Sequence, residues 1–192
     1  MRSMLRLLFI VPALAACQAT APQPSFPEFR YTHLPRIGLD VSRIEVRQNY
    51  QAPLRAPNVD HLFPVAPANA AVRWADDRLA AMGSAGTAVF VIEDASATAE
   101  RLPLTGGLRG AFTREQADRV TVSLRARLDV ETAGGLARGS AAAFATRSQT
   151  LAEDITLNER DRAHYLLTEQ AMGDLNAQLE ANIRQHLLSF LR

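Results

Sequence analysis

Residues 119–130 alternate strictly between apolar and polar side chains, and this pattern constrains the fold more than any other stretch of the chain. The apolar members are Val120, Val122, Leu124, Ala126, Leu128 and Val130. Because successive side chains of a strand point to opposite faces of a sheet, the pattern predicts an antiparallel strand with one buried and one wet face. Gly134 and Gly135 then favour a turn, and residues 139–150 are predicted to return as the partner strand of a hairpin.

Apolar residues at spacings of three and four indicate two helices. The longer pattern predicts a helix over 157–190, whose apolar stripe consists of Met172, Leu175, Leu179, Ile183, Leu187 and Phe190. The shorter pattern predicts a helix over 68–82 that is closed by Gly83. Trp74 lies off the apolar stripe of this helix, so we expect it at the edge of the core with its indole N–H bonded locally.

The remaining segments predict further strands and connections. Residues 37–46 alternate, but the parity changes near Ser42, which indicates a bend or bulge there. The proline-rich residues 51–68 are expected to cross the domain without regular structure. Residues 87–92 form a short apolar run that predicts a strand buried on both faces, and residues 102–112 are expected to form a loop.

Together these elements predict an α+β fold in a single domain over residues 31–192. The expected architecture is a mainly antiparallel sheet of about four strands, with one medium helix and one long C-terminal helix packed on one face.

The first 17 residues have the pattern of an export signal. Arg2 and Arg6 precede an apolar stretch over 7–14, which is too short to span a membrane. The following residues, Leu14-Ala15-Ala16-Cys17, end on the only cysteine of the chain. They resemble the lipobox of bacterial lipoproteins, which implies a signal peptide over 1–16 and an acylated Cys17 as the mature N-terminus. An ordinary secretory signal and a buried or free thiol are the alternative interpretations.

The resemblance to lipoproteins also implies a location. The mature chain would be held in the bacterial cell envelope by its lipid and would face the periplasm. Gln18 stands where an aspartate favours retention in the inner membrane, so the outer membrane is the preferred expectation. Residues 17–30 contain three prolines, and we expect them to form a lipidated tether below the domain.

Composition argues against a nucleic-acid partner. Removing the signal takes away two of the 21 basic residues and none of the 20 acidic ones, so the mature chain is close to neutral. A nucleic-acid-binding domain is normally strongly basic.

The sequence offers no catalytic assignment. The four histidines are scattered, without the close spacing typical of metal ligands, so neither a metal nor another cofactor is expected. The glycine-rich run over 106–110 fits neither dinucleotide nor phosphate-loop spacing, and we interpret it as a hairpin loop. The acidic pairs at 93–94 and 153–154 are interpreted as solvated groups or a helix cap rather than as general acids and bases.

One polar surface has two interpretations. Arg119, Arg125 and Arg127 share the wet face of the 119–130 strand, and Arg147 could join them from the neighbouring strand. This set could bind an anion, a lipid headgroup or an acidic partner. The alternative, which we prefer, is a solvated strand face whose charges discourage edge pairing.

In the architecture predicted over residues 37–190, together with the lipobox and the tether, the chain resembles the auxiliary lipoproteins of ABC-type and lipid-transport systems of Gram-negative envelopes. The resemblance rests on the lipobox, on RWADDRL at 73–79, on RVTVSLRARLDV at 119–130 and on the long terminal helix. It implies a non-enzymatic accessory or assembly component of a transport complex, with an envelope protein as partner. A lipoprotein that binds a lipid or small apolar ligand is the alternative, and an envelope hydrolase is the least favoured.

Overall fold

A four-stranded sheet forms the centre of the protein. The computed structural model describes residues 25–103 and 116–192. The strands lie in the order β2-β4-β5-β6, and their bounds are Arg43–Gln48, Thr87–Arg101, Gln116–Glu131 and Arg138–Ala152. β4, β5 and β6 are antiparallel neighbours, whereas β2 pairs in parallel with β4. The predicted mainly antiparallel sheet is therefore confirmed.

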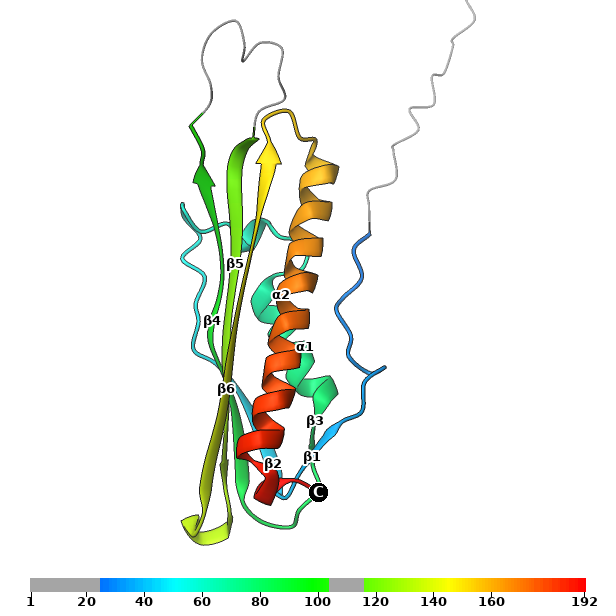
Figure 1. The fold of residues 1–192 in the computed structure, drawn as a ribbon, viewed down its shortest axis with the longest axis vertical. Coiled ribbons are helices and arrows are strands. Elements are labelled where there is room, and N and C mark those ends of the chain that lie inside the picture. The colour runs from blue at the N-terminus through cyan, green and yellow to red at the C-terminus, as the bar shows by residue number, and fades with distance from the viewer. Residues whose placement is uncertain (1–24, 104–115) are drawn as a thin grey trace, which may run out of the picture.

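Both helices cover the same face of this sheet (Figure 1). The medium helix α1 spans Pro67–Arg78 and the long helix α2 spans Leu157–His186. The core lies between the helices and the sheet, where the inward side chains of both helices and of β4, β5 and β6 are buried and Ile44 of β2 is partly buried. The α+β class and the single helical layer match the sequence prediction. No helix among the described residues is long and apolar enough to cross a membrane.

The predicted hairpin is present with its expected faces. β5 contains the predicted strand 119–130, and all six of its apolar residues are buried while the residues between them are partly or fully exposed. β6 pairs with it from Glu131↔Arg138 to Gln116↔Ala152, with one irregularity near the start of β5. Positive φ angles at Gly134 and Gly135 allow the turn that joins the two strands.

The strand predicted over 87–92 is longer and less buried than expected. β4 continues to Arg101, and its register against β5 shifts between Ile92 and Asp94. Its inward residues are fully buried and outward Val91 is also buried, but outward Thr87 and Val89 are only partly covered. The prediction of burial on both faces therefore holds for Val91 and fails for Thr87 and Val89, because no second layer of described residues covers the outer face of the sheet.

The helix predicted over 68–82 ends earlier, at Arg78. Leu79–Ala81 instead form β3, which pairs in parallel with β1 (Ile37–Leu39) in a separate two-stranded sheet. Gly83 approaches the backbone of Asp40 and Val41 so closely that a Cβ atom would clash. Pairing with a distant segment thus overrides the local helical spacing.

The chain changes sheets where the parity of residues 37–46 changes. Residues 40–42 lead from β1 into β2, which confirms the bend expected near Ser42. The proline-rich residues that follow β2 contain one short 3-10 helix, η1 (Asp60–Leu62), before α1 begins. Since parallel neighbours need a crossover connection, α1 accounts for the parallel pairing of β2 and β4.

The long helix α2 has the predicted stripe in the core, where all six stripe residues are buried. Regular helix ends at His186, and the last stripe residue, Phe190, belongs to the short helix η4 (Leu188–Phe190). The N-terminus of α2 is held by a capping box. In this box the Thr156 hydroxyl accepts from the Glu159 N–H, and the Glu159 carboxylate accepts from the Thr156 N–H. The spacing T-x-x-E is a sequence signal for this cap.

Trp74 lies deep in the core rather than at its edge. It is fully buried and stacks on Phe90, with 5.2 Å between the ring centroids. Its indole N–H donates to Asn176 Oδ1 of α2 at 2.8 Å, and not to a local group. The expectation from the helical stripe failed because α2 covers the side of α1 on which Trp74 lies.

Candidate interaction surfaces

The face of the main sheet opposite the helices is a polar surface that several strands build together. We call it the open face. Its arginines Arg119 and Arg127 are bound by acidic residues of the same sheet. Arg119 pairs with Glu100 at 3.6 Å, and Arg127 pairs with Glu93 at 3.0 Å and with Asp129 at 2.9 Å. Arg119 and Arg127 are therefore part of an ion-pair network within the sheet.

Arg125 differs from its two neighbours. It has no ion pair or hydrogen bond among the described residues. It stands opposite Phe144 of β6, whose side chain is 60% exposed. The next pair on this face of the two strands is polar, with the Ser123 and Thr146 hydroxyl oxygens 3.4 Å apart in a hydrogen bond. Arg125 and Phe144 thus form a free cation beside a free aromatic ring.

Arg147 does not belong to this set. It is opposite Val122, a buried residue of the helix-covered face, so it lies on the other side of the sheet from Arg125. There its Nη2 donates to Asp174 Oδ1 of α2 at 2.9 Å, and this hydrogen bond lowers the pKa of Asp174. The predicted grouping of Arg147 with the other arginines was wrong. The register of the hairpin pairs Arg147 with Val122, so its side chain lies on the helix-covered face of the sheet.

A hollow of about 770 Å³ lies on the open face near the β5–β6 turn. Arg43, Arg47 and Arg138 line it, together with Glu45 and Glu131. Each arginine is paired: both β2 arginines bind Glu45, and Arg138 binds Glu131 at 3.2 Å. Such a hollow offers mixed charge rather than a dedicated anion site.

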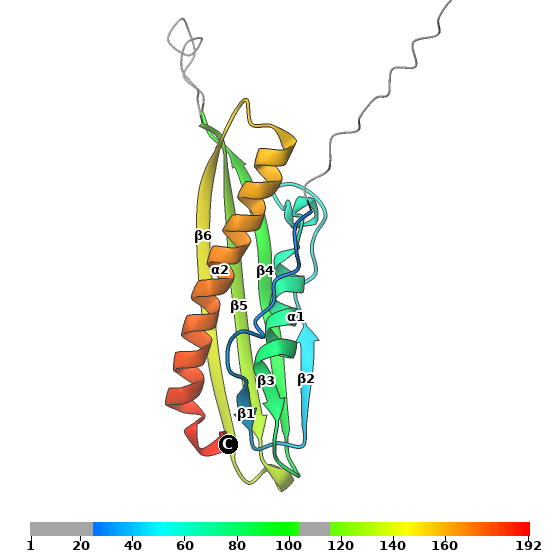
Figure 2. The ribbon, with the colours of Figure 1, turned by 90° about the vertical axis from the view of Figure 1, so that its right-hand side faces the viewer.

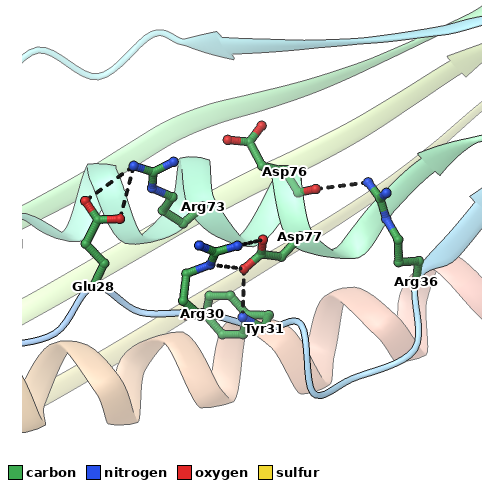
Figure 3. Close-up of polar contacts among 7 residues, drawn as sticks. All are labelled: Glu28, Arg30, Tyr31, Arg36, Arg73, Asp76 and Asp77. Atoms are coloured by element: carbon green, nitrogen blue, oxygen red, sulfur yellow. Dashed lines mark hydrogen bonds and ion pairs between the residues drawn. The ribbon is translucent and has the colours of Figure 1, made fainter.

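The segment before β1 is fastened to α1 by a second polar cluster, which we call the clasp (Figure 3). Arg30 binds Asp77 through two hydrogen bonds of 3.0 Å each, and the Tyr31 N–H donates to the same carboxylate at 2.9 Å. The hydrogen bond from Arg30 lowers the pKa of Asp77 most, and the hydrogen bond from the Tyr31 backbone lowers it further. Bidentate geometry of this kind fixes orientation as well as position.

Weaker contacts extend the clasp along the segment. Arg73 pairs with Glu28 at 3.0 Å, and the Arg36 guanidinium donates to the Asp76 carbonyl at 3.0 Å. Between them, Phe29 is buried and stacks on Tyr165 of α2 with centroids 4.5 Å apart. The domain therefore begins before residue 31. The predicted tether over 17–30 is too long at its C-terminal end because Phe29 packs into the core.

A fully buried arginine lies beneath the clasp. Arg78, the last residue of α1, is 0% exposed and its Nη2 donates to Glu180 of α2 at 2.6 Å. Its other terminal nitrogen donates to the Pro35 carbonyl, while its Nε has no partner. Arg78 therefore links the N-terminal segment, α1 and α2 from the inside.

Buried Asp60 of η1 organises the crossing after β2. Its Oδ1 accepts from the Ala97 N–H at 2.9 Å and from the Tyr50 hydroxyl at 3.0 Å. Burial, with this hydrogen bond, raises the pKa of Tyr50 to about 12. These contacts hold the proline-rich segment against β4.

Nothing in the described residues assembles a recognisable catalytic centre. No group of three histidine, cysteine or acidic side chains there could hold a metal ion. The predicted signal over 1–16, Cys17, Gln18 and the glycine run 106–110 lie outside the described residues. No family model matches the chain, and no curated protein matches it.

Proposed function

We propose that this protein is a lipid-anchored lipoprotein of the bacterial envelope that serves as a non-enzymatic accessory or assembly component of a transport complex. The observation that carries the proposal is the sequence Leu14-Ala15-Ala16-Cys17 with its single cysteine. The clasp supports it, because a chain end that bears an anchor needs firm attachment to its domain. The membrane favoured for the anchor is the outer one.

The surface of the domain supports a role in binding another protein. Four strands expose their outer side chains on the open face, and Arg125 with Phe144 offers one free charge beside one free ring. Arginine and aromatic residues are enriched in protein interfaces.

The alternative, a site for a lipid or small apolar ligand between helix and sheet, gains no support. Ala141, Ala143 and Ala145 let α2 pack closely on β6, and all three are buried. The hollow described above opens on the surface instead.

The anchor is tested by replacing Cys17 with serine. The wild-type chain should incorporate radioactive palmitate and remain with the membrane fraction, whereas Cys17→Ser should do neither. Continued labelling of the variant would refute the anchor. Gln18→Asp tests the location: it should move the protein from the dense outer-membrane fraction of a sucrose gradient to the lighter inner-membrane fraction.

The accessory role is tested by crosslinking in intact membranes followed by affinity purification. We expect a defined envelope complex that contains a transport component. Recovery of only the lipid-anchored monomer would contradict the proposal.

A further inference from the structure

Exposed leucines mark both ends of the elongated domain. Leu62 of η1 and Leu157 at the start of α2 are 55% and 73% exposed. At the opposite end, Leu136 of the β5–β6 turn is 91% exposed. Figures 1 and 2 agree that the first described residues, η1 and the start of α2 lie toward one end, and that the C-terminus and the β5–β6 turn lie at the other.

The chain leaves the domain beside the first pair of leucines. Phe26 lines the same surface hollow as Leu62 and Leu157, and its ring lies 5.3 Å from that of Tyr165. Since the clasp fixes the following residues on α1, this exit point cannot drift away from the two leucines. We call Phe26, Leu62 and Leu157 the exit patch.

The length of the chain restricts what the exit patch can meet. Eight residue-to-residue steps separate Cys17 from Ser25, which allows a reach of at most about 28 Å. α2 has 30 residues, so this helix alone is about 45 Å long. A lipid on Cys17 therefore keeps the exit patch near the bilayer in every orientation, whereas Leu136 stands beyond reach when the domain is upright.

We propose that the exit patch inserts Leu62 and Leu157 into the surface of the bilayer that holds the anchor, and that this contact sets the domain upright. The inference rests on the proposed lipid anchor. More than half of the surface of each leucine is exposed, and apolar burial at the membrane interface would remove that surface from water.

Apolar contact, not charge, carries this interaction. Arg160 and Arg162 follow Leu157 in the first turns of α2, but Asp161 stands between them and Glu159 is close by. Because the two signs balance, we expect the contact to persist at high salt, unlike that of a polybasic surface.

The test uses the acylated protein in vesicles of phosphatidylethanolamine and phosphatidylglycerol. Acylation blocks Cys17, so Leu157→Cys provides one site for a nitroxide label, and Leu136→Cys provides a matched site at the far end. We expect the label at 157 to collide several-fold more often with oxygen, which concentrates in lipid, than the label at 136. The label at 136 should collide more often with a water-borne nickel chelate.

Equal accessibility of the two labels in floating, acylated protein would overturn the inference and leave the anchor intact. Failure of the anchor has a different readout, because Cys17 itself would then take up label and the protein would not float with the vesicles. Leu62→Cys gives a second site, which should behave as 157 does. Raising the salt concentration should leave the difference in collision rates between the two labels unchanged. If high salt abolished this difference, the contact would not be apolar.

Discussion

Arg78 is a charged residue that is completely buried. Its guanidinium is permanently charged, yet its side chain is fully buried and one nitrogen lacks a partner. Among the described residues, Glu180 is the only carboxylate that forms an ion pair with it. Removing one member of a buried ion pair leaves the other charge uncompensated, which costs more than the pair itself contributes.

We therefore expect Glu180→Ala to destabilise the fold more than Arg78→Met. The first change strands a buried cation and should lower the free energy of unfolding by about 3 kcal/mol, whereas the second replaces the cation with an apolar chain of similar length. Glu180 remains bonded to Arg184 at 2.8 Å in the second variant. Urea unfolding measures both free energies, and the reverse order would contradict this view of Arg78.

His164 is another buried titratable residue with an unpartnered side-chain atom. Its ring stacks on Phe63 with 4.2 Å between centroids, and its Nδ1 has no hydrogen bond. Burial, followed by the charge of Arg160, lowers the pKa of His164, while Asp161 and a backbone hydrogen bond with Leu62 oppose the shift. The folded protein thus favours the neutral imidazole.

This lowered pKa predicts a loss of stability in mild acid. Below pH of about 6.5 the unfolded chain protonates this histidine while the folded chain resists, so the unfolded state is favoured by up to about 1.4 kcal/mol per pH unit. The loss continues until the pH reaches the folded-state pKa. Urea unfolding between pH 7.5 and 5.5 should show this slope in the wild type and not in His164→Gln.

Exposed His33 provides the control, because its replacement should leave the slope in place. The measurement stops above the range in which Asp77, Asp174 and Glu180 gain protons. The pKa of each of these carboxyls is lowered by arginine hydrogen bonds, so their contributions are lost only at lower pH. A slope that survives in His164→Gln would exclude His164 as its source.

At the level of elements, the packing of α2 on β6 depends on small residues. Ala143 faces the helix and is buried, while its neighbour Ala142 lies on the open face and is exposed. The Asn182 side chain of α2 reaches the Ala142 carbonyl at 2.7 Å, which is possible only when helix and strand are close.

We expect Ala143→Leu to lower the free energy of unfolding by about 1–3 kcal/mol, since the larger side chain must push α2 away from the sheet. Ala142→Leu adds the same atoms to the open face and should change stability by less than about 0.5 kcal/mol. Thermal or urea unfolding compares the two variants. Equal effects would mean that α2 does not need the small residues beneath it.

The elements that the sequence predicts well are those in which a single periodic pattern decides the structure. The alternation over 119–130 and the apolar stripe of α2 both continue over many residues. In each, the local backbone preference and the burial of apolar side chains therefore favour the same structure. β3 could not be predicted, because its three residues become extended only through pairing with distant β1. The parallel pairing of β2 with β4 likewise follows from the path of the chain and not from either strand alone.

The same distinction holds for the candidate surfaces. Alternation correctly places Arg119, Arg125 and Arg127 on one face, but the face of Arg147 depends on the register of the hairpin, which the turn sequence leaves open. Asp129 follows Arg127 by two residues in β5, but Glu100, Glu93 and Asp174, the other partners of these arginines, lie on other elements and carry no signal at fixed spacing. The clasp also joins residues nearly 50 positions apart, so neither Arg30 nor Asp77 could be recognised from the sequence.

The described part of the molecule is two-sided, with helices on one face of its sheet and none on the other (Figure 1). If the exit patch lies on the bilayer, the long axis of the domain projects away from the membrane. The open face is then exposed laterally, parallel to the membrane surface, and does not face the lipid. Arg125 and Phe144, in the middle of β5 and β6, are then presented to a neighbour in the same envelope complex.

The final prediction concerns this neighbour. A photoreactive phenylalanine analogue at position 144 should crosslink to an envelope protein in intact membranes, whereas the same analogue at Leu188, exposed beyond the end of α2, should give much less of that product. Phe144→Ser should reduce recovery of the same partner while changing the free energy of unfolding by less than about 0.5 kcal/mol, because the ring makes few contacts within the domain. Equal crosslinking from both positions, or unchanged recovery with Phe144→Ser, would place the partner elsewhere than on the open face.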